Sequence, residues 1–600
     1  MADRFLASIP SQQVGDWLLA FGGEARAIPS RFSGQVWQQI QEGAEWQLWS
    51  CSVSPEWRGF PLRQWHSAAW QFWLLGEVTN LTDIDSLNSE DSTPSPLVIA
   101  ALNGSFLLWG WERTTHNWHI WTDRFATLHA YYAWDGSRAA YGTFSPAVAA
   151  VTSCKKIDGL GLAGFFSYGF FPQDRTYWEE VKILRPATHF ILDRTGKLIG
   201  QERYWSWQQG LEQRRSYPDT VAEFAALFEA VMSDHARHGR IALPISGGLD
   251  SRSTVAALNH SAEHGGGRFW SYSYGYTQKS IETRIARQVA TTRRLPFEAY
   301  TIQPYLFDRL EGILSWTEGF QDLVLARQAF VRDEIAARSD AVICALWGDV
   351  WLNDMGLADR LPGSISDSEL IEHMVKMIQK PGGKWLLDHL NIDLPREETS
   401  ARLTETVQEE LSKLESIPDY DFRIKAYKTE QWSFRWSLPA IRVFQSAAWP
   451  RLVFYDTRMA DFFCSVPSEW LCARQMQIDY LKRFAPDLAH IIWQPYRANL
   501  YAYRYYNSWL LPRRALEKLW RSLTRQQVTE RNWEVQFLCP QGRAGLNAWL
   551  LRPGLRLHEY FSPASLSQLL ADFQERSLDK EIGYTLSMLA TFSAWLETYG

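Results

Sequence analysis

The sequence predicts an α/β protein made of two parts: a mainly β N-terminal half and a parallel-sheet half that becomes helical toward the C-terminus. Up to about residue 205, short apolar and aromatic runs alternate with turn residues, a pattern typical of hairpins. From residue 216 on, apolar runs alternate with helical patterns, which indicates a parallel sheet. A chain of 600 residues is long enough for two or more domains. We therefore expect one domain over residues 1–205 and another over 216–600, with 365–600 mostly helical.

The N-terminal half has the pattern of antiparallel strands joined by tight turns. Residues 71–80 are one of several runs rich in aromatic and aliphatic side chains. Turn dipeptides separate such runs at Asp135-Gly136 and at Thr195-Gly196. We therefore expect hairpin turns at these two places.

A polar stretch, residues 206–219, is the candidate linker between the halves. Beyond it, apolar residues recur at helical spacing, at Val221, Phe224, Ala225, Phe228 and Val231. Thr220 and Glu223 have the spacing of a capping box. These signals predict that the second half opens with a helix.

The second half alternates apolar runs with helices. The runs at residues 241–245, 268–274 and 341–346 read as strands, and helical patterns separate them. Ligands of parallel sheets bind at the carboxyl ends of the strands. A glycine loop follows the first run and Gly348-Asp349 follows the third, so both are expected at that edge.

The glycine loop consists of Ser246, Gly247, Gly248, Leu249, Asp250 and Ser251. Without side chains at the two glycines, backbone N–H groups can point inward, and the following helix adds its positive N-terminal dipole. The serine hydroxyls add further donors to this anion cradle. Asp250 suits a bound anion only if a cation stands between them, which suggests a magnesium ion bridging to phosphate.

The alternative for this loop is an ordinary tight turn from strand to helix, with the aspartate as the helix cap. The full six-residue pattern between an apolar strand and a helix favours a nucleotide loop instead. It has neither the Gly-Lys-Ser/Thr of a Walker loop nor the Gly-x-Gly-x-x-Gly of a dinucleotide fold.

Residues 246–251 resemble the pyrophosphate loop of the ATP-pyrophosphatase superfamily. Over most of its length the chain resembles the asparagine synthetase family, which includes β-lactam synthetases and lasso-peptide cyclases. The resemblance implies ATP and Mg²⁺ as cofactors. It also implies that the loop residues bind the nucleotide.

Further residues match motifs of that family. Glu282 stands where the family has an acidic residue before an Ala-Arg-x-x-Ala helix, and is implied to bind the cofactor. Asp349 lies in what resembles a reduced form of the second acidic loop, which makes it the partner of Asp250 in holding magnesium. Arg451 and Asp456 align with the family segment Arg-x-Pro-Phe-Leu-Asp.

The N-terminal half resembles a class II glutaminase domain, which implies an αββα sandwich of the Ntn-hydrolase type. Residues 73–80 are similar to its Asn-Gly-Glu-Ile-Tyr-Asn strand. Such enzymes use an N-terminal cysteine, but Ala2 occupies that position, and Cys51 lies too close to the strand to replace it. Leu75 replaces the asparagine that would stabilise an oxyanion. We therefore expect a domain that does not hydrolyse glutamine, and favour a structural role for it over substrate binding.

The second half also departs from the family. Leu346 stands where the family has glutamate or tyrosine, and Trp449 where glutamate is usual. Members of the family also carry a lysine late in the chain that stabilises the departing pyrophosphate, and this sequence has no clear counterpart of that lysine. Arg497 and, as a weaker choice, Lys482 are the candidate catalytic cations.

The leading functional hypothesis is an ATP-dependent ligase that adenylates a carboxylate, releases AMP and pyrophosphate, and transfers the acyl group to ammonia or a substrate amine. The acyl substrate would be a small molecule or a peptide. One alternative is a non-catalytic nucleotide-binding scaffold or regulator. Another is RNA modification, for which the basic stretch 503–525 is the only support.

The charge and residue composition indicate which partners and metal sites are not expected. A net charge of −6 gives no reason to expect nucleic acid or an anionic membrane, and no apolar run is long enough to span a bilayer. Cysteine and histidine spacing supports no zinc or thiol-redox site. We expect a cytoplasmic protein, with a homodimer left open, in which the 31 tryptophans fill the cores.

Overall fold

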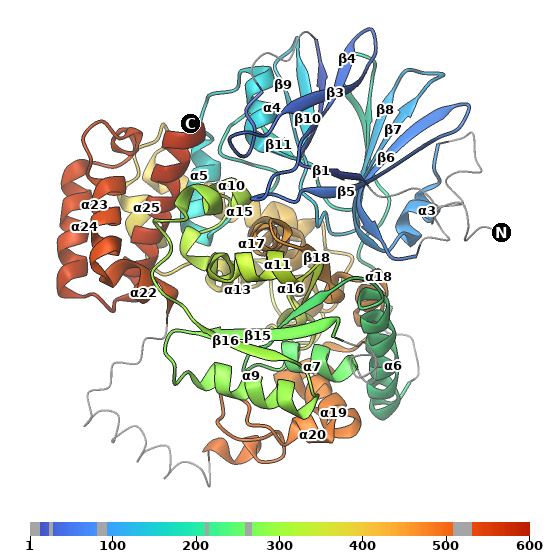
Figure 1. Cartoon of the computed structure of the whole chain (residues 1–600), viewed down its shortest axis with the longest axis vertical. Coiled ribbons are helices and arrows are strands. Elements are labelled where there is room, and N and C mark those ends of the chain that lie inside the picture. The colour runs from blue at the N-terminus through green and yellow to red at the C-terminus, as the bar shows by residue number, and fades with distance from the viewer. Residues whose placement is uncertain (1–11, 23–27, 81–92, 211–214, 259–266, 508–530) are drawn as a thin grey trace.

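The computed structural model describes residues 12–22, 28–80, 93–210, 215–258, 267–507 and 531–600. In Figure 1 the N-terminal half lies above the parallel-sheet half, and the C-terminal helices lie beside both. Ala2, residues 211–214 of the expected linker and most of the basic stretch 503–525 lie outside the described residues.

The N-terminal half contains two antiparallel sheets, which confirms a mainly β half. The first sheet has seven strands in the order β1 (Gln12–Val14), β5 (Phe60–His66), β6 (Trp70–Val78), β7 (Gly104–Glu112), β8 (Trp118–Thr122), β12 (Thr188–Leu192) and β13 (Leu198–Arg203). The second has six strands in the order β11 (Lys182–Ile183), β9 (Tyr131–Trp134), β10 (Ala139–Gly142), β2 (Trp17–Phe21), β4 (Trp46–Cys51) and β3 (Trp37–Glu42). The described part of this half also contains the helices α3 (Pro96–Ala101), α4 (Ser145–Thr152) and α5 (Gly159–Tyr168).

Tryptophans join the two sheets face to face. Trp73 of β6 stacks on Trp118 of β8 with ring centroids 5.4 Å apart. Trp17 and Trp46 of the other sheet pack against them, with Trp46 and Trp118 centred 4.9 Å apart. Successive strand residues point to opposite faces, so Phe72 instead packs in a separate cluster beneath α3. Many of the tryptophans therefore fill the core, as the sequence predicts.

Both expected hairpin turns are present. Gly136 joins β9 to β10 with a φ of +96°, which favours glycine, and the Asp135 carboxylate accepts the N–H of Ser137 and Arg138. Gly196, at a φ of +82°, turns β12 into β13.

The first helix of the second half, α6 (Tyr217–His235), begins one turn earlier than the capping-box spacing suggests. Its N-cap is Ser216, whose hydroxyl accepts the N–H of Asp219. Pro218 fits the first turn, where a missing N–H costs nothing. The capping box at Thr220 is therefore wrong, because Thr220 already lies inside the helix.

The second half is built on a five-stranded sheet, which is parallel as predicted. Its order is β16 (Phe297–Thr301), β15 (Phe269–Gly275), β14 (Ile241–Pro244), β17 (Ala341–Cys344) and β18 (Trp449–Leu452). Helices around it include α7 (Asp250–Ala257), α9 (Ile281–Thr292), α10 (Leu310–Thr317), α11 (Arg332–Arg338) and α12 (Gly348–Trp351). The strand order reverses between β14 and β17, where open α/β sheets bind ligands.

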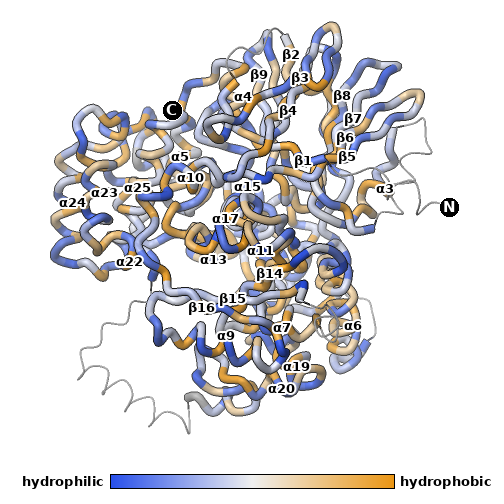
Figure 2. The backbone as a smooth tube through the Cα atoms, viewed as in Figure 1, coloured by the Kyte–Doolittle hydropathy of each residue, from blue (hydrophilic) through white to orange (hydrophobic). Residues whose placement is uncertain are grey.

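The C-terminal part is helical, as expected, apart from β18. It contains α13 (Asp367–Ile378), α14 (Gly383–His389), α15 (Arg396–Ser412), α16 (Tyr420–Tyr427), the π-helix η3 (Lys428–Ser437), α17 (Leu438–Gln445), α18 (Thr457–Phe463), α19 (Gln475–Phe484), α20 (Pro486–Ala489) and α22 to α25 (Asn532–Leu538, Pro540–Leu550, Pro563–Glu575 and Lys580–Tyr599). Hydrophobic and hydrophilic residues alternate along outer helices such as α9 and α24 (Figure 2), as expected for amphipathic helices.

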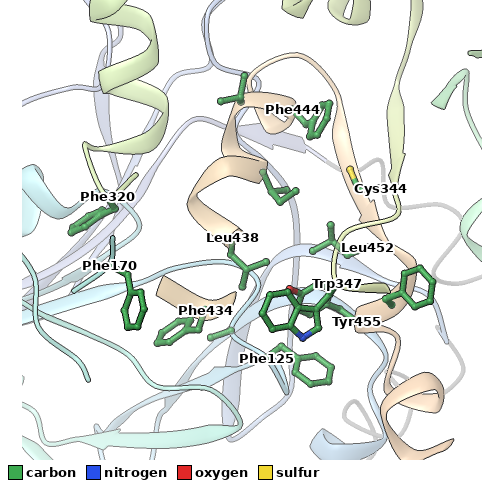
Figure 3. Packing of buried hydrophobic residues seen from close by; sticks show 14 of the residues in the cluster. Phe125, Phe170, Phe320, Cys344, Trp347, Phe434, Leu438, Phe444, Leu452 and Tyr455 are labelled. Carbon is green, nitrogen blue, oxygen red and sulfur yellow. The ribbon is translucent and has the colours of Figure 1, made fainter. Parts of the chain in front are cut away.

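The two halves share one continuous core. Figure 3 shows Phe125 of the N-terminal half beside Tyr455 and Trp347 of the other half, and the rings of Phe125 and Tyr455 lie 5.5 Å apart. A buried charge network also crosses the boundary, in which Arg31 binds both Asp16 and Glu318. Within the described ranges, no helix has both the length and the apolarity needed to cross a bilayer.

Candidate functional site

The glycine loop lies at the carboxyl end of the central strand β14, where it borders a cavity of about 310 Å³. Loops after three neighbouring strands contribute to the wall, including Ser246 and Ser251 after β14 and Leu346 after β17. Residues 436–444, from the end of η3 and from α17, close the other side. The structure thus places the loop and the Gly348-Asp349 segment at one edge of the sheet, as the sequence predicts.

The polar groups of the loop converge on one another. The N–H of Ser246 donates to Ser251 Oγ at 2.9 Å, and the two serine hydroxyls lie 3.0 Å apart. The N–H of Gly248 donates to Ser246 Oγ at 3.2 Å. An anion oxygen bound to the loop could accept from these same N–H and hydroxyl groups in place of the internal bonds.

Position 247 requires a glycine because the side chain of Gln494 packs closely against the backbone there. A Cβ atom at residue 247 would lie 2.2 Å from Oε1 of Gln494 and 2.9 Å from its Cβ. The N–H of Gln494 also donates to the Gly247 carbonyl at 3.3 Å. The segment that carries Gln494 is held by buried Arg252 of α7, which donates to the carbonyls of Ile491 and Ile492 at 3.0 and 2.7 Å.

Asp250 is held by two side chains from the segment around α19. Its Oδ1 accepts from Arg474 Nη1 at 2.9 Å and from Gln477 Nε2 at 3.0 Å. Burial raises the pKa of Asp250 to about 6; nearby Asp349 raises it too, while Arg474 lowers it. The carboxylate is thus ionised at neutral pH and would gain further from a cation.

Asp349 lies in the first turn of α12 and is exposed. The chain reaches it through Trp347, which has a left-handed φ of +79° and whose Nε1 donates to Thr429 Oγ1 at 3.1 Å. A Cβ at Gly348 would lie 3.1 Å from Cγ of Asp250, so the two acidic loops touch at this glycine. The structure therefore brings Asp250 and the Asp349 loop together.

This donor set fits magnesium. Mg²⁺ in proteins takes one or two carboxylates and completes its shell with water and substrate phosphate. Asp250 and Asp349 would supply the carboxylates at the mouth of the glycine loop. Among the residues that the structure describes, no group of three or more His, Cys, Asp or Glu side chains could hold a metal ion by itself.

Glu282 lies in the first turn of α9 and also lines the cavity. Burial raises its pKa, and Arg327 across the cavity wall lowers it. Glu282, Arg327 and the serines of the glycine loop therefore line the same cavity.

The structure shows the surroundings of the two candidate cations, Lys482 and Arg497. Lys482 extends over the rings of Tyr501 and Tyr503, 5.5 and 6.0 Å from their centroids. Arg497 is exposed and lies three residues beyond Gln494. The side chains found against the loop are those of Gln494 and, through Asp250, of Arg474.

Sequence reasoning missed Arg474, Gln477 and Gln494. Each reaches the loop from more than 200 positions away along the chain, so no local spacing connects them to it.

In the N-terminal half, the residues that resemble a glutaminase form structural contacts. Cys51 is buried, and burial raises the pKa of its thiol to about 12, which disfavours the thiolate that a nucleophile needs. Glu77 pairs with Arg451 of the other half at 3.4 Å. Asn103 donates to Asp456 at 2.7 Å. Arg451 and Asp456 thus join the halves.

Comparisons with known proteins give little further information. No protein-family model matches the sequence, and a search of curated proteins gave no match. Similar solved structures include a glutamine phosphoribosylpyrophosphate amidotransferase from B. subtilis complexed with ADP and GMP, at 10% identity and a TM-score of 0.20, covering 49% of this chain and 68% of that one. Another, described as the allosteric regulatory enzyme of purine biosynthesis, has 8% identity and a TM-score of 0.19, covering 49% and 76%. TM-scores this low support no inference about fold or activity.

Proposed function

We propose that this protein is an ATP-dependent ligase of the asparagine synthetase type, which adenylates a carboxylate and transfers the acyl group to an amine. The observation that carries the proposal is the contact of the two acidic loops, where Gly348 meets Asp250 at the mouth of the glycine loop. The glycine loop and the Asp349 loop both follow the strands between which the strand order reverses, which supports a ligand site there.

The proposed reaction has two steps. A carboxylate oxygen of the substrate attacks the α-phosphorus of ATP, and the bond to the bridging oxygen breaks to release pyrophosphate. The amine nitrogen then attacks the acyl carbon, the bond to AMP breaks, and the amine loses a proton to solvent or a nearby base. The cofactor Mg²⁺, bound by Asp250 and Asp349, would neutralise phosphate charge.

The protein's contribution is positioning and charge. The N–H groups of Ser246 and Gly248 and the two serine hydroxyls, which bond to one another within the loop, would donate to pyrophosphate oxygens. Arg474 adds positive charge at the same place, since it already binds Asp250. We therefore propose Arg474 as the pyrophosphate-side cation, ahead of Arg497 and Lys482.

We further propose that the N-terminal half is an Ntn-type glutaminase-like domain without glutaminase activity. Leu75 is fully buried in the sheet and Cys51 is a buried thiol, so neither can serve in amide hydrolysis. The amine would then be free ammonia or an amino group of the substrate. The role of the domain is to support the ligase half through Arg31, Glu77 and Asn103.

One observation favours a second candidate, a nucleotide-binding scaffold. Asp250 is already neutralised by Arg474 and hydrogen-bonded by Gln477, so the loop is internally satisfied without a metal ion. A scaffold would bind ATP in this state and would not turn it over.

The two candidates differ in ATP–pyrophosphate exchange. The purified protein would be assayed with magnesium over a panel of carboxylic acids that includes aspartate, beside Asp250→Asn and, as a matched surface control, Asp572→Asn. If the protein is a ligase, we expect exchange with at least one acid in the wild type and in Asp572→Asn, and none in Asp250→Asn. ATP binding without exchange for any acid would favour the scaffold, and absence of ATP binding would refute both.

A further inference from the structure

Two lysines share the ring of one tryptophan beside the cavity. Lys380, two residues beyond the end of α13, places Nζ 4.5 Å from the ring centroid of Trp432. Lys428 places its Nζ 4.7 Å from the same centroid. Lys380 also lies 4.7 Å from the ring centre of Trp436, and Lys428 lies 5.9 Å from that of Trp347. Two ammonium groups and three indole rings thus form one cluster.

This lysine–tryptophan cluster borders the site on two sides. Trp436 lines the cavity. Trp347 directly follows Leu346, another lining residue, and directly precedes the loop that contains Asp349. Trp432 and Trp436 both belong to the π-helix η3, and π-helical turns are frequent at functional sites. The cluster therefore connects the cavity wall with the second acidic loop.

The two ammonium groups lack a close counterion. Throughout the described parts of the chain, neither Nζ lies within salt-bridge distance of a carboxylate, and Lys428 Nζ instead contacts Met355 Sδ at 3.6 Å. Asp322, the acid that acts on Lys380 from further away, already accepts bonds from Ser587 and the N–H of Val324. Both lysines are half-buried, and Lys428 acts on Lys380 as a nearby like charge. Partly buried charges without a paired group are costly, and a bound anion would reduce that cost.

Electrostatics agree with this geometry. Burial lowers the pKa of Lys380 to about 8, Lys428 lowers it further, and Asp322 opposes both effects. Burial also lowers the pKa of Lys428, which Asp349 partly restores. An anion between the two lysines would favour their charged forms.

We propose that Lys380 and Lys428 form an anion subsite at the edge of the cavity, which binds an acidic group of a ligand other than the carboxylate that is activated. The role of this subsite in binding a substrate rests on the proposed function. Anion binding by the two lysines does not, because it requires no turnover of ATP. The indole faces of Trp432 and Trp436 would contact the carbon skeleton next to the acidic group. The acidic group is either a carboxylate of the acyl substrate or a phosphate. Both are oxyanions that accept hydrogen bonds from lysine ammonium groups.

The test is protection of the two lysines from an amine-reactive reagent, quantified by peptide mass spectrometry on the full chain at about pH 8. Succinate probes the carboxylate source, and inorganic phosphate and pyrophosphate probe the phosphate source. Methyl succinate, which has lost one charge, is the matched control ligand. Exposed Lys376 of α13 is the internal control.

The expected result is that at least one dianion slows modification of both Lys380 and Lys428 by about tenfold at saturation, while Lys376 is unaffected. Protection by succinate but not by phosphate identifies the carboxylate source, and the reverse identifies the phosphate source. Unchanged rates with every anion, or equal protection by methyl succinate, would overturn the proposal.

Variants provide a second readout. Lys428→Met keeps the aliphatic stem on the rings and removes one charge, so we expect about tenfold weaker protection of Lys380, whereas Lys428→Arg retains protection. Protection of Lys380 that survives Lys428→Met would contradict a shared site. Because protection is measured without ATP, a protein that binds anions but shows no exchange would refute the ligase and not the subsite.

Discussion

Arg474 donates a 2.9 Å hydrogen bond to the same carboxylate oxygen of Asp250 that Gln477 reaches at 3.0 Å. The glycine loop therefore contains a carboxylate already balanced by a guanidinium, at the place where a metal ion and pyrophosphate would bind. Binding of a ligand has to share or replace this ion pair. The properties of Asp250 should consequently respond to Arg474 in measurable ways.

The first prediction concerns pH. Arg474 lowers the pKa of Asp250, so Arg474→Met should raise that pKa above its value of about 6. Only the ionised carboxylate binds a cation, so affinity for ATP with magnesium should rise with pH through about 6 in the wild type and through a higher pH in the variant. Calorimetric titrations at several pH values measure this shift. Arg483→Met, in the helix α19 that follows Arg474, is the control, and a profile that stays or moves to lower pH contradicts the assignment.

The second prediction concerns the contact between the acidic loops. An alanine at Gly348 would place its Cβ 2.7 Å from the ring of Phe454 and 3.1 Å from Asp250 Cγ, which must push the loops apart. We expect Gly348→Ala to lower the rate of ATP–pyrophosphate exchange by about 100-fold, since catalytic groups misplaced by about 1 Å lose that much. Gly210→Ala, where a new Cβ meets nothing within 4 Å, should leave the rate unchanged. Equal rates for both variants would show that the contact is irrelevant.

The third prediction separates metal binding from nucleotide binding. Asp349→Asn removes one proposed ligand of magnesium, so the concentration of Mg²⁺ that gives half-maximal exchange should increase by about tenfold. Asp349 also raises the pKa of Asp250, so the variant should keep Asp250 ionised to lower pH. Magnesium titrations of exchange measure the first effect. An unaltered magnesium requirement would exclude Asp349 as a ligand.

The fourth prediction concerns Arg252, a fully buried residue that holds the segment carrying Gln494. Arg252→Met leaves the carbonyls of Ile491 and Ile492 without their donor, so we expect the free energy of unfolding to fall by about 2–3 kcal/mol. ATP affinity should fall as well, because Gln494 packs on Gly247. Denaturant unfolding measures the change, with exposed Arg284→Met as the control. A variant as stable as the control would show that Arg252 does not anchor this segment.

The fifth prediction concerns the N-terminal half. Because Cys51 is buried and protonated, neither the wild type nor Cys51→Ser should release ammonia from glutamine. Exchange activity of the ligase half should be the same in both proteins. Glutamine hydrolysis that disappears in Cys51→Ser would show that the thiol is a working nucleophile.

Much of the fold follows from local patterns. Turn residues at Gly136 and Gly196 mark hairpins because only a glycine-favoured φ closes them, and the alternation of strands with helices predicts the parallel sheet. The capping box predicted at Thr220 and Glu223 is wrong because these residues match the motif by spacing alone. Ser216 and Pro218 together give the stronger start.

The site could be predicted only in part. The glycine loop and Asp349 are each visible in a short stretch that follows a strand, so topology brings them to one edge of the sheet. Arg474, Gln477 and Gln494 come from a distant segment whose path is set by the buried bonds of Arg252, which no local spacing reveals. The lysine–tryptophan cluster likewise depends on how α13 and η3 pack.

The most direct test of the central claim is to identify what the protein makes from ATP. With magnesium, a carboxylic acid that supports exchange, and ammonia, phosphorus NMR of the reaction should show AMP and pyrophosphate in equal amounts, neither of them formed by Asp250→Asn. Formation of ADP and phosphate instead would contradict adenylation and the role assigned to the glycine loop.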